Sequence, residues 1–187
     1  MDKKWFARLL IGVAGLSSVA VTAGEMFPPT IQTLAAKLVH CSRAELKAFR
    51  LIHVGNAALY LEDCQAINNI FTQSPKQLRF AYEKAIPAKA FREASEEYLK
   101  INLGQQYALW EQTFKDFNSN YRDVKDGDYY DLVFDSKAGL QLFLNQKLLG
   151  SVTNVDQGLA YFNVWFGKEP FSEDLKKSLL TTKLTAK

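Results

Sequence analysis

The segment "GDYYDLVFDSKAGLQLFLNQKLLGSV", residues 127–152, decides the fold class, because it reads as three strands in succession. Strands are predicted at 129–134 and 139–144, joined across residues 136–139. Asn145 and Gln146 then provide a tight turn into a third strand at 147–152. Because such short turns join antiparallel neighbours, the segment predicts a three-stranded antiparallel meander.

Further strands precede this meander. Residues 49–61 are rich in Val, Ile, Leu and Tyr and predict a long strand with a bulge near Gly55. Residues 76–86 alternate between apolar and polar side chains, as a strand does. The stretch 31–52 is ambiguous because its composition also suits a helix, and a short helix is expected over 64–71.

Helical patterns alternate with the strands. Apolar residues recur at helical spacing through 88–103 and 105–118. A further helix begins at Asp156, with Gly167 at its C′ position, and Ser172 caps the last helix. The order of strands, helices, strands and helices predicts an α+β fold, a mostly antiparallel sheet with helices layered on one face.

Residues 1–23 have the order of a secretory signal peptide. Basic residues precede an uncharged run of 13 residues, Leu9 to Val21, and small residues follow it. A membrane-spanning helix needs about 20 residues, so we favour cleavage after Ala23 over an anchor. We therefore expect a periplasmic or secreted protein whose residues 24–187 form one domain, with no later transmembrane segment.

Charge excludes one class of partner. The leader carries three basic and one acidic residue, so its removal lowers the formal net charge from +3 to +1. No basic stripe remains that would attract a polyanion, and a nucleic-acid partner is not expected.

Two cysteines, Cys41 and Cys64, lie in this exported sequence, where a disulfide is permitted. If residues 46–61 form one extended strand, its ends lie about 50 Å apart at about 3.3 Å per residue. A disulfide requires Cα atoms within about 6 Å of each other. On this geometry we predict that the two cysteines are not bridged.

The sequence offers no motif for catalysis or cofactor binding. There is no G-x-S-x-G nucleophile segment and no glycine-rich phosphate loop. The histidines, His40 and His53, and the two cysteines match no metal-ligand spacing. We therefore expect no metal and no cofactor.

Three segments together resemble the bacterial branch of the chalcone isomerase-like superfamily. The first is "AFRLIHVGNAALYLEDC" (48–64), and the second is the meander quoted above. The third is "YFNVWFGKEPFSEDLKKSLL" (161–180), which is similar to a helix ending in Trp-x-Gly-x-x-Pro followed by a final leucine-rich helix. The resemblance implies the open-faced sandwich of that family, with the Gly–Pro break serving the architecture.

The resemblance also implies a site. Plant chalcone isomerases close a flavanone ring with an arginine, a threonine, a tyrosine and an asparagine. Aligned without gaps on the Leu59–Asp63 motif, the arginine falls on Arg43 and the threonine on Gly55, which has no hydroxyl. The tyrosine falls near Ala90 or Phe91, and the asparagine near Glu97 or Tyr98. The anion partner is therefore kept and the carbonyl-polarising groups are lost.

Related members of the fold bind fatty acids, with an arginine on the carboxylate and a tyrosine that would fall near Gly55 or Asn56 here. The resulting hypothesis is a non-catalytic exported protein that binds a small amphipathic anion, such as a fatty acid, in a sheet–helix cleft. Its candidate ligand-binding residues are Arg43, Gly55, Asn56, Phe91 and Tyr98. Two alternatives stay open: an isomerase (an intramolecular lyase) with a rearranged site, and an envelope protein that binds a partner protein and no small ligand.

Overall fold

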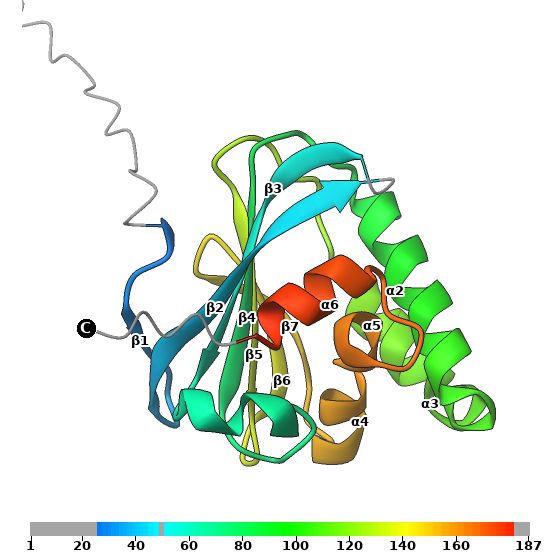
Figure 1. Cartoon of the computed structure of the whole chain (residues 1–187). Helices are drawn as coiled ribbons and strands as arrows, with labels where there is room; N and C mark the ends of the chain where they lie inside the picture. Colours follow the sequence, from blue (N-terminus) through cyan, green and yellow to red (C-terminus); the bar gives the residue numbers. More distant parts are fainter. Residues whose placement is uncertain (1–25, 49–50, 182–187) are drawn as a thin grey trace, which may run out of the picture.

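The computed structural model describes residues 26–48 and 51–181, so the predicted signal peptide lies outside the described residues. Seven strands form one sheet in which every strand pairs antiparallel with its neighbour in sequence (Figure 1). The strands are Thr30–Gln32 (β1), Lys37–Ala48 (β2), Ile52–Leu61 (β3), Lys76–Tyr82 (β4), Tyr129–Asp135 (β5), Gly139–Leu144 (β6) and Lys147–Val152 (β7).

The helices pack on one face of the curved sheet (Figure 1). They are the 3-10 helix Cys64–Asn69 (η1) and the α-helices Ala88–Leu103 (α2), Gln105–Asn118 (α3), Val155–Ala160 (α4), Asn163–Phe166 (α5) and Glu173–Leu179 (α6). The predicted α+β fold, with its antiparallel sheet and single helical layer, is confirmed. Within the described part of the chain, no helix is long and apolar enough to cross a membrane.

Local signals in the sequence account for these elements. The meander β5–β6–β7 turns at Asn145 and Gln146, which both have positive φ, as a two-residue hairpin requires. The helices α2 and α3 have the predicted bounds. The side chain of Ser172 accepts a hydrogen bond from the N–H of Leu175 and so caps α6 as predicted.

The predicted long strand is wrong in one respect. The segment 46–61 is not one extended strand, because the chain reverses near Ala48 and returns as β3. The strands β2 and β3 pair from Ala48 opposite Ile52 to Val39 opposite Leu61. A register shift beside Gly55 confirms the predicted bulge.

This hairpin overturns the prediction that the cysteines are separate. Cys41 lies on β2 and Cys64 begins η1 just after β3, so antiparallel pairing brings them to the same end of the hairpin. They form a disulfide, with Cα atoms 5.2 Å apart. The prediction was wrong because the two cysteines do not lie at opposite ends of one extended strand; they lie close together at one end of a two-stranded hairpin.

The Gly167–Pro170 break is held by a side chain from α2. The amide of Asn102 donates to the carbonyl of Glu169 at 2.7 Å and accepts from its N–H at 2.9 Å. Gly167 has an extended backbone and not the left-handed conformation expected of a C′ glycine. A Cβ at Gly167 would overlap the side chain of Asn102, so close approach requires the glycine.

Hydrophobic residues pack on both faces of the sheet. The main core lies beneath the helices and includes Leu59, Leu78, Phe80 and Leu132. A smaller cluster lies on the opposite face, which we call the outer face, and is formed by Phe27, Leu38, Ala58, Tyr60 and Ala81. Since side chains alternate along a strand, each residue of β3 and β4 can be assigned to one of the two faces.

Candidate functional site

The helix-covered face, where a ligand cleft was predicted, is filled by aromatic side chains. Phe91 of α2 lies 5.4 Å from Tyr82, 5.5 Å from Tyr121 and 5.3 Å from Tyr130, measured between ring centroids. Rings at these separations are in direct contact. The sheet–helix interface is therefore a packed aromatic layer.

A group of polar atoms is enclosed in the same layer. The hydroxyl of Tyr161 donates to Oδ1 of Asn118 at 2.5 Å and lies 3.3 Å from the hydroxyl of Tyr121. Within the described residues, three buried side-chain polar atoms have no hydrogen-bond partner: Nδ2 of Asn118 in this group, the hydroxyl of Tyr107 on α3, and the hydroxyl of Tyr60 on the outer face. Buried donors of this kind are normally satisfied, so they mark a place for a water or a ligand acceptor.

These hydroxyls are suited to donating hydrogen bonds and not to proton abstraction. Burial raises the pKa of Tyr121 to about 12 and raises the pKa of Tyr161 well above its ordinary value. Both groups therefore stay protonated near neutral pH. A general base would need a pKa near the working pH.

Two of the five predicted ligand-binding residues, Arg43 and Asn56, lie on the outer face. Arg43 is opposite Ala58 in the β2–β3 register, and its guanidinium is 4.6 Å from the ring centroid of Phe27. The side chain of Asn56 donates to Glu83 at 2.9 Å. Neither residue points toward the helices.

The other three predicted residues are placed differently. Phe91 and Tyr98 belong to α2 and are half-buried. Tyr98 packs edge-on against Phe171. Gly55 has a φ of +152°, and a Cβ there would overlap the carbonyl oxygen of Ala81. The structure brings Phe91 and Tyr98 to the helix-covered face and separates them from Arg43 and Asn56 by the thickness of the sheet.

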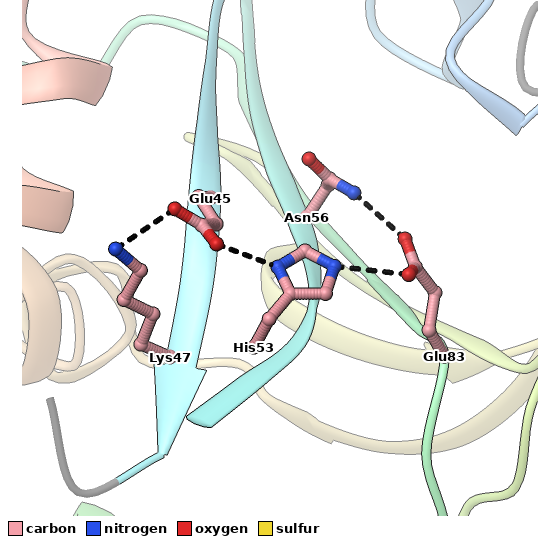
Figure 2. Close-up of polar contacts among 5 residues, drawn as sticks. All are labelled: Glu45, Lys47, His53, Asn56 and Glu83. Carbon is pink, nitrogen blue, oxygen red and sulfur yellow. Dashed lines mark hydrogen bonds and ion pairs between the residues drawn. The ribbon is translucent and has the colours of Figure 1, made fainter. Parts of the chain in front are cut away.

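A polar network surrounds His53 near the end of the β2–β3 hairpin (Figure 2). Nδ1 of His53 is 2.9 Å from Glu45, and Nε2 is 2.9 Å from Glu83. Lys47 pairs with Glu45 at 2.9 Å, and this hydrogen bond is the main reason that the pKa of Glu45 is lowered. The imidazole thus joins side chains from three adjacent chain segments.

The geometry of the His53 network differs from that of a metal site. Its two carboxylates bind opposite sides of one imidazole ring and so do not converge on a common point (Figure 2). No group of three or more potential metal ligands occurs among the residues described. The network links side chains of β2, β3 and the residue that follows β4 at the exposed end of the outer face.

Two buried cations were not recognised from the sequence. On the outer face, Arg79 forms a bidentate salt bridge with Asp131, with nitrogen–oxygen distances of 2.7 and 2.8 Å. Lys76 lies on the helix-covered face and is 1% exposed. The signal for Lys76 was present, because strand alternation places it in phase with Leu78 and Phe80 on the apolar side.

Two hollows of the described surface lie beside the helical layer. One, of about 320 Å³, is lined by polar side chains where α3 meets the end of β7. The other, of about 120 Å³, lies under the segment that contains η1 and includes Lys76 in its wall. The smaller one borders the helix-covered face of the sheet.

The comparisons with known proteins agree with this architecture. A fatty-acid binding protein from Arabidopsis thaliana is similar in structure, with a TM-score of 0.58 over 82% of this chain and 90% of that chain, at 17% sequence identity. No curated protein matches the sequence at a significant level. The sequence model described as chalcone isomerase-like matches residues 22–181. The chain therefore belongs to the chalcone isomerase-like family.

Proposed function

We propose that this protein is an exported, non-catalytic member of its family that binds a small amphipathic anion, such as a fatty acid, on the helix-covered face of the sheet. One observation carries the proposal. An apolar, aromatic layer encloses buried hydrogen-bond donors, the hydroxyl of Tyr107 and Nδ2 of Asn118, that no described protein group satisfies. A ligand with an apolar body and an oxygen-rich end matches that surface.

The absence of catalysis is supported by the position of the two residues that the family resemblance singles out. Gly55 aligns with the threonine of the isomerases, and its φ and its contact with Ala81 leave no room for a side chain. Arg43 aligns with the arginine but lies on the outer face beside Phe27. Loss of one preorganised donor to a developing oxyanion typically costs about 100-fold or more in rate.

Export is supported by the covalent chemistry of the fold. The Cys41–Cys64 disulfide is of the kind that persists in oxidising compartments and is rare in reducing ones. Together with the leader-like residues 1–23, it favours a periplasmic or secreted protein. The mature N-terminus, determined by mass spectrometry, is expected to follow Ala23, and an intact Met1 on the exported protein would reject this part of the proposal.

Entry of a ligand would require movement at the edge of the aromatic layer. Phe91 and Tyr98 of α2 are only half-buried, and Tyr98 packs edge-on against Phe171. We expect these two side chains to meet an entering apolar chain first. Replacing Phe91 with alanine should therefore change the affinity for a fatty acid more than replacing an exposed residue such as Leu109 does.

The test is a titration with a fluorescent fatty acid followed by displacement with unlabelled palmitic acid. Saturable binding that palmitic acid displaces is expected, together with no cyclisation of a hydroxylated chalcone above its spontaneous rate. Sustained turnover of the chalcone would replace the proposal with the isomerase. No uptake of either ligand would leave partner binding as the function.

A further inference from the structure

Lys76 is a lysine buried beside aromatic rings. Its side chain is 1% exposed, and Nζ lies 4.5 Å from the ring centroid of Phe134 and 5.9 Å from that of Phe162. The ammonium donates to the carbonyls of Thr72 and Ser74 at 2.6 and 2.5 Å. An ammonium has three N–H donors, so these carbonyls leave one that no described protein group accepts.

The charge of Lys76 is also unbalanced within the protein. The other buried cation, Arg79, is neutralised by Asp131 on the outer face. None of the ion pairs among the described residues includes Lys76. A buried ion without a counterion costs several kcal/mol, which an added anion would offset.

A hollow that could hold such an anion has Lys76 in its lining. The cavity of about 120 Å³ has Lys76 in its wall together with the apolar side chains of Leu61, Ala66 and Pro75. Two carboxylates, Glu62 and Asp63, line the same cavity, but both are exposed and Asp63 already caps η1 by accepting from the N–H of Gln65. The cavity can hold a group as small as a carboxylate.

We propose that Lys76, and not Arg43, binds the carboxylate of the ligand. This inference rests on the proposed function and names the anion partner within it. Lys76 faces the helix-covered side of β4, in phase with Leu78, Phe80 and Tyr82. The distance from Lys76 to Tyr82 along this strand is about 20 Å at about 3.3 Å per residue, comparable with a long acyl chain. A carboxylate at Lys76 would direct an acyl chain along β4 toward Phe91, and the packed side chains of Leu78 and Phe80 would have to move aside to admit it.

The neutral donors of the aromatic layer do not replace Lys76 in this role. Tyr107 and Asn118 can bind a water or a carbonyl oxygen, but they bring no charge to offset that of a carboxylate. Hydrogen bonds between an ionised donor and an ionised acceptor are roughly twice as strong as neutral ones. The carboxylate should thus prefer the ammonium.

The test compares palmitic acid with the chain-matched alcohol hexadecanol, on the wild-type protein and on two variants. Lys76→Met removes the buried ammonium while filling similar space, and Lys147→Met removes an exposed lysine as the control for net charge. We expect Lys76→Met to bind palmitic acid about 10-fold to 100-fold more weakly. Its affinity for hexadecanol and both affinities of Lys147→Met should match those of the wild type.

The outcomes separate the two proposals. If the wild type binds palmitic acid and Lys76→Met binds it equally well, the role of Lys76 is overturned and the proposed function stands. If the wild type takes up neither ligand, the proposed function fails and the inference fails with it.

A second measurement needs no variant and so does not depend on folding of Lys76→Met. Palmitic acid labelled with ¹³C at its carboxyl group and protein labelled with ¹⁵N at lysine report on both partners by NMR. We expect a shift of the Lys76 Nζ signal on adding palmitic acid and none on adding hexadecanol. An unchanged Nζ signal while palmitic acid is bound would overturn it.

Discussion

Arg79 donates through Nε and Nη2 to the two carboxylate oxygens of Asp131, and a third donor, Nη1, binds the carbonyl of Met26 at 2.9 Å. The pair lies on neighbouring strands beneath the outer hydrophobic cluster, with side chains 10% and 8% exposed. The ring of Tyr129 covers the guanidinium at 4.4 Å. The pair thus joins the N-terminal segment to the outer face of the sheet.

Breaking this pair on one side should be costly. Asp131→Asn leaves the guanidinium of Arg79 buried without a counterion, and we expect a loss of about 3 to 5 kcal/mol in the free energy of unfolding. Replacing both residues with apolar ones, as in Arg79→Met with Asp131→Leu, should cost much less. Urea unfolding of the single and double variants provides the measurement, and equal losses in the two would contradict this account of the pair.

The disulfide should contribute to stability through the unfolded state. It links residues separated by 23 positions, and a closed loop of that size corresponds to about 3 kcal/mol. We expect the double variant Cys41→Ala with Cys64→Ala to unfold at a lower urea concentration than the oxidised wild type. Reduced wild-type protein should resemble the variant, and identical unfolding curves with and without reductant would show that no bridge forms.

Gly55 should tolerate no side chain. Its φ of +152° disfavours L-residues, and a Cβ would overlap the backbone of Ala81 in the next strand. Gly55→Ala is therefore expected to destabilise the protein by more than about 2 kcal/mol. Gly127 is the matched control, because its φ is also positive at +85° but nothing lies near its Cβ position.

In that control, Gly127→Ala should cost only about 1 kcal/mol, the conformational term alone. Thermal unfolding of both variants measures the difference. Equal melting temperatures for the two would mean that Ala81 does not restrict position 55. A threonine could then be accommodated there.

Stability should rise with pH because of Lys76. Burial lowers the pKa of Lys76 from 10.5 to about 8. Between these values the unfolded chain keeps a proton that the folded chain has released, so the folded state gains stability as pH rises. The gain relative to Lys76→Met should be on the order of 3 kcal/mol across this range.

The measurement is urea unfolding of the wild type and of Lys76→Met at several pH values from 7 to 10. The exposed lysines and tyrosines are common to both proteins and cancel in the difference. Below pH 8 the variant should be the more stable, since it carries no buried charge. Parallel curves over the whole range would show that Lys76 is not desolvated in the folded protein.

Much of the fold could be predicted because its signals are local. The meander has turn residues at Asn145 and Gln146, and α2 and α3 have helical periodicity with a break at Gly104. The β2–β3 hairpin was missed because Ala48–Ile52 contains no glycine, proline, asparagine or aspartate to announce a turn. The missed turn led directly to the wrong prediction for the disulfide.

The site could be predicted only in part, because it depends on which face of the sheet each residue occupies. Arg43 was assigned from an alignment, which does not report direction, and register shifts along β2 and β3 help to decide the face. The strand alternation indicates which face Lys76 occupies, but the sequence does not show that its ammonium is buried. Its burial arises from η1, Phe134 and Phe162, which come from separate parts of the chain.

Native mass spectrometry of the protein purified from its own compartment tests the central claim most directly. We predict a mass that exceeds the disulfide-bonded polypeptide by that of a fatty acid or a similar amphipathic anion. Delipidation should remove this excess and palmitic acid should restore it, while Lys76→Met should retain less. A protein that carries only its polypeptide mass and takes up no palmitic acid would contradict the claim.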